Sequence, residues 1–210
     1  MNRRRLIWQK AQEQGGLPEG YTAVNYLQSS GTQWIEMGVA PNQNTKAVLK
    51  IKINKFEGSG ATLIGSRTEN NSNDQFTTYI DSAYGTTRFL FRVDGQPKSI
   101  PWTGLTTDKI YTVTLSGTEM KAELEDGTTV FSTTFSVNDF TSTMTMTLFR
   151  AKNVNGSYFQ GRIYSCKHYN GNELIQDFVP CLDTNGVPCI FDLVSRKPFY
   201  NKGSGSFTWG

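Results

Sequence analysis

The sequence predicts an all-β protein, folded as an antiparallel sandwich of two sheets. Short apolar and aromatic runs alternate with polar residues at the period of two that is typical of strands. Tight-turn dipeptides such as Asp126-Gly127 and Asn170-Gly171 separate these runs at hairpin spacing. After residue 20 the sequence shows no convincing helical periodicity, and this combination favours a sandwich.

The clearest strand covers residues 47–53, where Leu49, Ile51 and Ile53 fall on one buried face. Asp126-Gly127 joins the two strands of the most regular hairpin in the chain. Further strands are expected, in chain order, at residues 62–65, 75–81, 88–93, 99–102, 111–115, 120–125, 128–135 and 143–149.

The last fifty residues, 161–210, give the strongest strand and turn signals. A strand of alternating residues ends at Asn170-Gly171, a dipeptide that suits both central positions of a type I′ turn. The return strand, residues 174–179, is expected to stop at Pro180, because proline cannot donate a hydrogen bond to a ladder. Asn185-Gly186 then turns the chain into the next strand, and short closing strands follow.

Three segments of the chain carry recognisable motifs. Residues 161–210 form the first, residues 17–39 with YLQSSGTQWI at positions 26–35 the second, and Leu63-Ile64-Gly65-Ser66-Arg67 the third. These segments resemble concanavalin A-like, LamG-type jelly-roll modules of phage and prophage structural proteins. The resemblance implies one jelly-roll domain over residues 17–210 and a place in a virion.

The first sixteen residues differ in composition from the rest and form the only stretch rich in helix formers. We expect a basic N-terminal arm, residues 1–16, that docks on a partner protein, because Trp and Arg are common interface anchors. A frayed terminus and contact with nucleic acid are the two alternatives. The expected docking residues are Arg3, Arg4, Arg5 and Trp8.

The charge of the chain argues against a nucleic-acid-binding body. The sequence has 21 basic and 18 acidic residues, and 17 and 16 of these lie after residue 20. A body so close to neutral has no strong field for phosphates. No apolar run reaches the length of a membrane span, and the apolar core of the N-terminus, Leu6-Ile7-Trp8, is too short for a secretory signal. We therefore expect no nucleic acid, no membrane contact and synthesis in the host cytoplasm.

Three cysteines and one histidine limit the metal and thiol chemistry of the chain. The preferred interpretation places Cys166, Cys181 and Cys189 in or near the core as small apolar side chains. A single disulfide with one thiol left over and a zinc site that includes His168 remain as alternatives. His168 itself is expected to be a hydrogen-bonded sheet residue. We expect no cofactor and no metal.

Catalytic groups are scarce. One histidine leaves little room for a Ser-His-Asp site. Glucan-cleaving jelly rolls carry a cluster of carboxylates on one strand, and the nearest equivalent here is Glu123 with Glu125, two residues apart. Because Lys121 shares their face and Asp126-Gly127 follows at once, a solvated hairpin tip is the preferred interpretation. The sequence therefore predicts a protein that is not an enzyme.

A carbohydrate-binding face needs aromatic rings and planar polar side chains, and residues 67–102 are rich in both. The alternative is that these aromatic residues fill the core and the arginines solvate the surface. Trp34 and Trp209 are expected in the core. The candidate carbohydrate-binding residues are Arg67, Asn73, Asp74, Tyr84, Arg88 and Trp102.

The resemblance and the scarcity of catalytic groups together imply a non-enzymatic phage virion protein with a lectin-like domain for a host-surface glycan. Its place would be capsid decoration, a head fibre or the tail. The arm would bind other virion proteins, and we expect an oligomer in the particle. A purely structural decoration protein and a glycan-hydrolysing jelly roll are the alternatives.

Overall fold

The computed structural model describes residues 16–56, 61–67, 75–81, 88–93, 100–151 and 158–210. These residues form seventeen strands in two sheets, and every pair of neighbouring strands is antiparallel. None of the described residues lies in a helix. The predicted two-sheet sandwich is confirmed. The arm residues Arg3, Arg4, Arg5 and Trp8 lie outside the described residues, so the arm stays a prediction.

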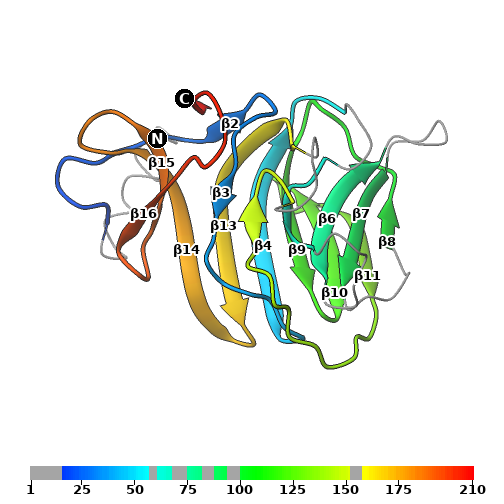
Figure 1. Cartoon of the computed structure of the whole chain (residues 1–210). Helices are drawn as coiled ribbons and strands as arrows, with labels where there is room; N and C mark the ends of the chain where they lie inside the picture. Colours follow the sequence, from blue (N-terminus) through cyan, green and yellow to red (C-terminus); the bar gives the residue numbers. More distant parts are fainter. Residues whose placement is uncertain (1–15, 57–60, 68–74, 82–87, 94–99, 152–157) are drawn as a thin grey trace.

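The larger sheet has eleven strands, and its long strands β4, β13 and β14 lie side by side (Figure 1). β1 pairs with β14, while β2 pairs with both β13 and β17. The main path runs β11 (Thr129–Thr134), β10 (Glu119–Leu124), β9 (Ile110–Ser116), β4 (Thr45–Ile53), β13 (Gly161–Asn170), β14 (Glu173–Leu182), β15 (Pro188–Asp192) and β16 (Lys197–Tyr200), with β1 (Thr22–Ala23), β2 (Leu27–Ser29) and β17 (Thr208–Trp209) beside it.

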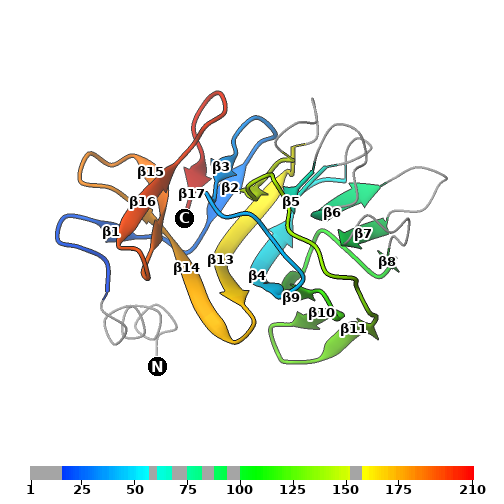
Figure 2. The same cartoon turned by 60° about the horizontal axis from the view of Figure 1, so that its bottom comes forward.

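The smaller sheet has six strands and supplies the second layer. Figures 1 and 2 place its strands β6, β7 and β8 at one end of the molecule and β15 and β16 at the other. In spatial order the strands are β3 (Ile35–Glu36), β12 (Thr147–Leu148), β5 (Ile64–Ser66), β6 (Phe76–Asp81), β7 (Arg88–Val93) and β8 (Ile100–Trp102).

The core lies between the two sheets and follows from strand alternation. Along β4, buried and half-buried residues alternate without interruption, and Leu49, Ile51 and Ile53 are buried as predicted. Ile35 and Ile64 of the smaller sheet belong to the same hydrophobic cluster. Burial of each such side chain stabilises the fold by about 1.5–3 kcal/mol. The side chains at the other positions of each strand point to the outer faces of the sandwich.

One turn prediction is corrected by the register. The β13–β14 hairpin forms where expected, but Asn170 pairs with Glu173, so the turn residues are Gly171 and Asn172. Gly171 has φ +60°, whereas Asn172 is not among the described residues with positive φ. Positive φ at the first central position is typical of a type II′ turn rather than the predicted type I′ turn.

The predicted stop at Pro180 is wrong, because β14 continues to Leu182. Val24 donates its backbone N–H to the Pro180 carbonyl at 3.2 Å. Proline keeps its carbonyl acceptor, so it can take part in this hydrogen bond without a backbone N–H of its own. The strand expected at residues 143–149 is also shorter, since β12 covers just Thr147–Leu148.

Candidate binding face on the smaller sheet

A row of four residues crosses the outer face of the smaller sheet. Thr147 pairs with Glu36 on one side and with Gly65 on the other, and Gly65 pairs with Thr77. Directly paired residues of antiparallel strands share a face. Ile64, the neighbour of Gly65 in the chain, points into the core, so these four residues face outward. We call Glu36, Thr147, Gly65 and Thr77 the polar row.

Gly65 allows the two sides of this row to approach closely. A Cβ atom added at Gly65 would collide with Oγ1 of Thr77 and would lie 3.0 Å from its Cβ. The Thr77 side chain therefore occupies the space above the glycine. Thr147 Oγ1 lies within hydrogen-bonding distance of the carbonyl oxygens of Gly65, at 3.1 Å, and Arg150. The side chain of Thr77 packs directly against the backbone of Gly65, which leaves no room for a larger residue at position 65.

Two buried polar atoms on this face lack a partner. Thr77 is 1% exposed and Gln75 is 3% exposed, and alternation along β6 puts both on the outer face. Thr77 Oγ1 and Gln75 Oε1 have no hydrogen-bond partner within the part of the chain that the structure describes. An unsatisfied buried polar group costs about 1–3 kcal/mol. Because both oxygens are covered by other atoms of the protein, a ligand that supplies hydroxyl groups recovers that free energy only when this cover moves aside.

An arginine between two aromatic rings borders the polar row. The guanidinium carbon of Arg150 lies 5.4 Å from the ring centroid of Trp34 and 5.1 Å from that of Tyr158. Trp34 precedes Ile35 of β3, so alternation places it on the same face as Glu36. Cation–π contacts of this kind hold the three side chains in place. Arg150 Nε is buried and has no partner among the described residues.

Arg67 is the one sequence-predicted candidate that the structure brings to this face. It follows Ser66 of β5 and lies one step beyond the Ser66–Phe76 pair, opposite Gln75. Its side chain is half-buried. Of the other candidates, Asn73, Asp74 and Tyr84 lie outside the described residues. The backbone of Arg88 pairs with Asp81 at the end of β6, and its side chain is not described.

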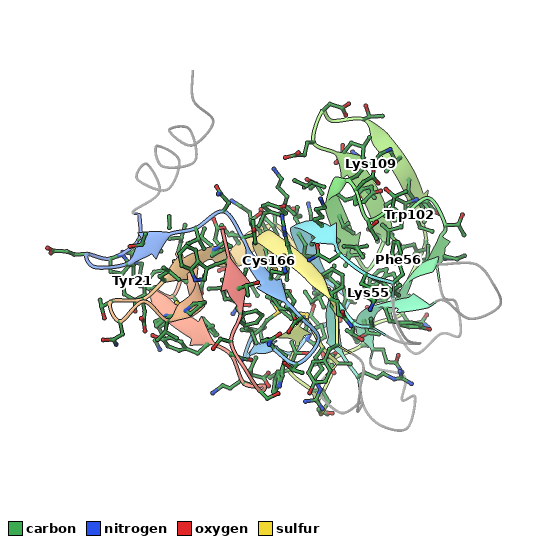
Figure 3. The ribbon with its side chains drawn as sticks, turned by 90° about the horizontal axis from the view of Figure 1, so that it is seen from above. Tyr21, Lys55, Phe56, Trp102, Lys109 and Cys166 are labelled. Atoms are coloured by element: carbon green, nitrogen blue, oxygen red, sulfur yellow. The ribbon has the colours of Figure 1, made fainter. Side chains whose placement is uncertain are left out.

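Trp102 is corrected from a candidate sugar-stacking residue to a core residue. It is 3% exposed, and its ring packs edge-on against Tyr111 with the ring centroids 5.2 Å apart. Phe56, which Figure 3 also labels, packs its side chain against the core as well. A ring covered on its faces by protein cannot stack on a sugar. The opposite correction applies to Trp209, which was expected in the core and is 50% exposed.

Sequence reasoning missed Trp34, Tyr158, Arg150 and Thr77 as site residues. Trp34 lies within the YLQSSGTQWI motif, but an aromatic residue next to a buried strand was interpreted as core. Its ring does pack against the core on one side, while Arg150 lies over it. The alternation of Gln75, Phe76 and Thr77 was a usable signal for outward-facing polar side chains. The missing information was which strands lie next to each other.

The carboxylates considered for catalysis lie on the larger sheet and are each paired with a lysine. Glu123 Oε1 is 2.7 Å from Lys121 Nζ, and Glu125 Oε1 is 2.8 Å from Lys50 Nζ. β10 ends at Leu124, so Glu125 lies in the turn and not in the strand. This arrangement is the solvated hairpin tip that the sequence favoured.

His168 is a buried, hydrogen-bonded sheet residue, as predicted. Its Nδ1 donates to Gln176 Oε1 at 3.1 Å in the neutral tautomer that this contact favours, and Gln176 Nε2 donates to the Met37 carbonyl at 2.8 Å. Burial lowers the pKa of His168, and the bond to Gln176 opposes that shift. His168 is thus held neutral in the interior.

Among the described residues, no group of three or more His, Cys, Asp or Glu side chains is placed to hold a metal ion. The same part of the chain contains no helix with the length and apolarity needed to cross a membrane.

The fold of the chain is similar to that of solved structures. A Bacteroides ovatus protein for which carbohydrate binding has been proposed aligns with a TM-score of 0.60 and 13% identity, over 90% of this chain and 60% of that one. The chain has the concanavalin A-like jelly-roll fold. The SAP-like pentraxin of Limulus polyphemus aligns at a TM-score of 0.49 with 13% identity, over 90% of this chain and 94% of that one. Mouse laminin α1 domains LG4-5 align at 0.45 with 17% identity, over 92% and 47%.

The jelly roll spans about 60% of the length of the Bacteroides protein. No protein-family model matches the chain, and no curated protein matches it in sequence. At these identities the similarity establishes the fold alone, so any ligand has to be argued from the residues of the face itself.

Proposed function

We propose that this jelly roll is a non-enzymatic carbohydrate-binding module whose glycan site is the outer face of the smaller sheet. The observation that carries the proposal is the pair of buried, unpaired oxygens, Thr77 Oγ1 and Gln75 Oε1, beside an aromatic–arginine stack. Sugar hydroxyls donate to such oxygens and accept from guanidinium N–H groups, while pyranose C–H faces stack on aromatic rings. The face offers acceptor oxygens and a guanidinium donor, and Tyr158 is the ring left for stacking, because Trp34 lies between the core and Arg150.

The carbohydrate-binding assignment proposed for the Bacteroides protein of the same fold supports this choice of ligand class. The pairing of Glu123 and Glu125 with lysines supports binding without hydrolysis. A glycosidase needs one carboxylic acid to protonate the leaving group and a second carboxylate as base or nucleophile. Two carboxylates engaged in separate ion pairs at a hairpin tip fit neither role.

A glycan array tests the binding function. The expected result is saturable binding of the folded protein to a bacterial surface polysaccharide, competed by the same free sugar. Absence of binding at millimolar sugar would favour the alternative of a decoration protein without glycan affinity. Release of reducing ends from the bound glycan, abolished by Glu123→Gln or Glu125→Gln, would instead favour an enzyme.

The virion role rests on the resemblance of residues 17–39 and 161–210 to phage and prophage modules and on the basic arm that precedes them. In this proposal the arm binds other virion proteins, several copies assemble in the particle, and the jelly roll faces the host surface. Copurification of the protein with intact particles is the expected result. Its absence from purified virions would contradict this part of the proposal and leave the glycan site untouched.

A further inference from the structure

Two cysteines face each other across neighbouring strands of the larger sheet. Cys181 of β14 pairs directly with Cys189 of β15, and both side chains are fully buried. Their Sγ atoms lie 3.4 Å apart. Both are free thiols in this structure. Neither thiol takes part in the proposed glycan site, which lies on the other sheet.

The register places this pair at a separation that a disulfide can span. Asp183 donates its backbone N–H to the Val187 carbonyl at 3.0 Å, which marks that pair as a hydrogen-bonded one. Hydrogen-bonded pairs recur every second residue, so Cys181 and Cys189 form the next one along the hairpin. Cα atoms of such pairs are about 5.5 Å apart, and disulfides join Cα atoms about 4.4–6.8 Å apart. The two sulfur atoms need only side-chain rotation to meet.

The third cysteine, Cys166, lies too far from Cys181 and Cys189 to form a disulfide with either. Cys166 of β13 belongs to the main core between the sheets, whereas Cys181 and Cys189 belong to a separate small cluster with Phe191. Figure 3 shows Cys166 well away from Tyr21, which packs on that small cluster. The topology therefore allows one intrachain pairing.

The start of the jelly roll covers the two thiols. In β1, Ala23 pairs with Cys181, and the Tyr21 ring packs edge-on against Phe191 at 5.3 Å. Arg196 fixes the beginning of this segment by donating to the Gly16 carbonyl at 2.7 Å. An oxidant can reach the thiols only when this segment opens locally.

Reaction of the reduced thiols should be slow for a second reason. The bond between the two thiols, together with burial, raises the pKa of Cys181 above its ordinary value. A thiol attacks a disulfide as its thiolate, so a raised pKa lowers the rate. A slow reaction and a single pairing distinguish the proposed disulfide from unspecific oxidation of the thiols, so a test has to measure both.

We propose that Cys181 and Cys189 form an intrachain disulfide when the protein meets a small disulfide oxidant such as oxidised glutathione. The Cys181 or Cys189 thiolate attacks the oxidant, releases one glutathione thiol and leaves a mixed disulfide on the protein. The second cysteine then attacks that bond and releases the second glutathione. One S–S bond replaces two S–H bonds, and two electrons pass to glutathione disulfide, which becomes two thiols. The new bond joins β14 to β15, and β1 pairs with the other edge of β14, so the bond ties the hairpin together next to the strand through which residues 16–23 attach.

Peptide mapping reads out the pairing directly. Trypsin cuts after Arg162, Lys167 and Arg196, so Cys166 falls in residues 163–167 while Cys181 and Cys189 share residues 168–196. The folded full-length chain is incubated with oxidised glutathione and quenched in acid, then unfolded in denaturant at mildly alkaline pH, alkylated and digested. We expect the 168–196 peptide to lose about 2 Da and to take no alkylating group, while the 163–167 peptide is alkylated in full.

Four variants make the result decisive. Cys166→Ala should leave the oxidation unchanged. Cys181→Ala and Cys189→Ala should each abolish the 2 Da loss, and thermal melting shows whether they remain folded. Tyr21→Ala removes part of the cover and should increase the rate of oxidation several-fold. The proposal is overturned if the folded wild-type chain keeps two alkylatable thiols in residues 168–196, or if oxidation links Cys166 or joins two chains.

Discussion

The two outer faces of the sandwich differ in whether their polar side chains have partners. On the larger sheet, Lys121 pairs with Glu123 at 2.7 Å and Lys167 pairs with Asp177 at 3.0 Å. Lys46 and Lys50 lie over tyrosine rings at 5.4 Å and 5.8 Å. On the smaller sheet, Thr77 and Gln75 carry buried oxygens without a partner among the described residues. The polar groups named on the first face have partners, and those named on the second face do not.

The largest expected effect concerns the close approach on the smaller sheet. Gly65→Ala would drive a methyl group into Thr77, and overpacking of this kind costs about 1–3 kcal/mol. Chemical denaturation should show the loss of unfolding free energy. Gly65→Ala in a Thr77→Ala background is the matched control, since the colliding Oγ1 of Thr77 is then absent. Equal destabilisation by Gly65→Ala in the two backgrounds would contradict the packing argument.

Removal of the stacked arginine is expected to affect binding rather than stability. Arg150→Ala deletes the guanidinium between Trp34 and Tyr158 and with it a donor to the ligand. A charged hydrogen bond contributes about 1.5–3 kcal/mol, so glycan affinity should fall at least about tenfold. Calorimetric titration with the glycan found on the array measures the change. Affinity within a factor of two of wild type would place the site elsewhere.

A buried polar group with partners offers a contrast to Thr77. Because the pKa of His168 is lowered in the fold, the unfolded chain binds the proton first as the pH falls below 6.5. Stability from this residue is therefore complete above pH 6.5 and decreases below it, by at most about 1.4 kcal/mol per pH unit. Urea denaturation at pH 7.5 and 5.5 measures the decrease, and His168→Gln should flatten it. A rise in stability toward pH 5.5 would contradict the sign.

The unpaired hydroxyl gives the sharpest distinction between the faces. Thr77→Val keeps the shape of the side chain and removes Oγ1, so the fold should gain about 1 kcal/mol while glycan affinity decreases. Thermal denaturation and titration on the same sample test both halves. Thr112→Val, at a half-exposed position on the outer face of the larger sheet, is the matched control and should change neither quantity appreciably. Loss of stability in Thr77→Val would show that Oγ1 is already well paired.

The smallest effect is expected on the larger sheet. Lys121→Ala removes one partner of a surface ion pair, and such pairs contribute about 0–1 kcal/mol. Stability should change by less than 1 kcal/mol, and glycan affinity should stay the same. A marked loss of affinity would show that the glycan binds the larger sheet and would contradict the proposed site on the smaller sheet.

The sandwich could be predicted from the sequence because its strands and turns are encoded by local residue patterns. The alternation in β4 and the turn at Asp126-Gly127 depend on residues next to each other in the chain, and both are confirmed. The binding face depends on pairing between distant segments, such as Gly65 with Thr77 and Thr147 with Glu36. Trp102 was predicted to bind sugar from aromatic composition alone, but its position in β8 directs its side chain into the core.

A titration followed by NMR tests the central claim most directly. Isotopically labelled protein would be titrated with an oligosaccharide of the glycan that it binds on the array. We expect the backbone amide shifts to change along β3, β5, β6 and β12 and to stay constant along β4, β9, β10 and β13. Shift changes that follow the larger sheet and spare the smaller one would contradict the account.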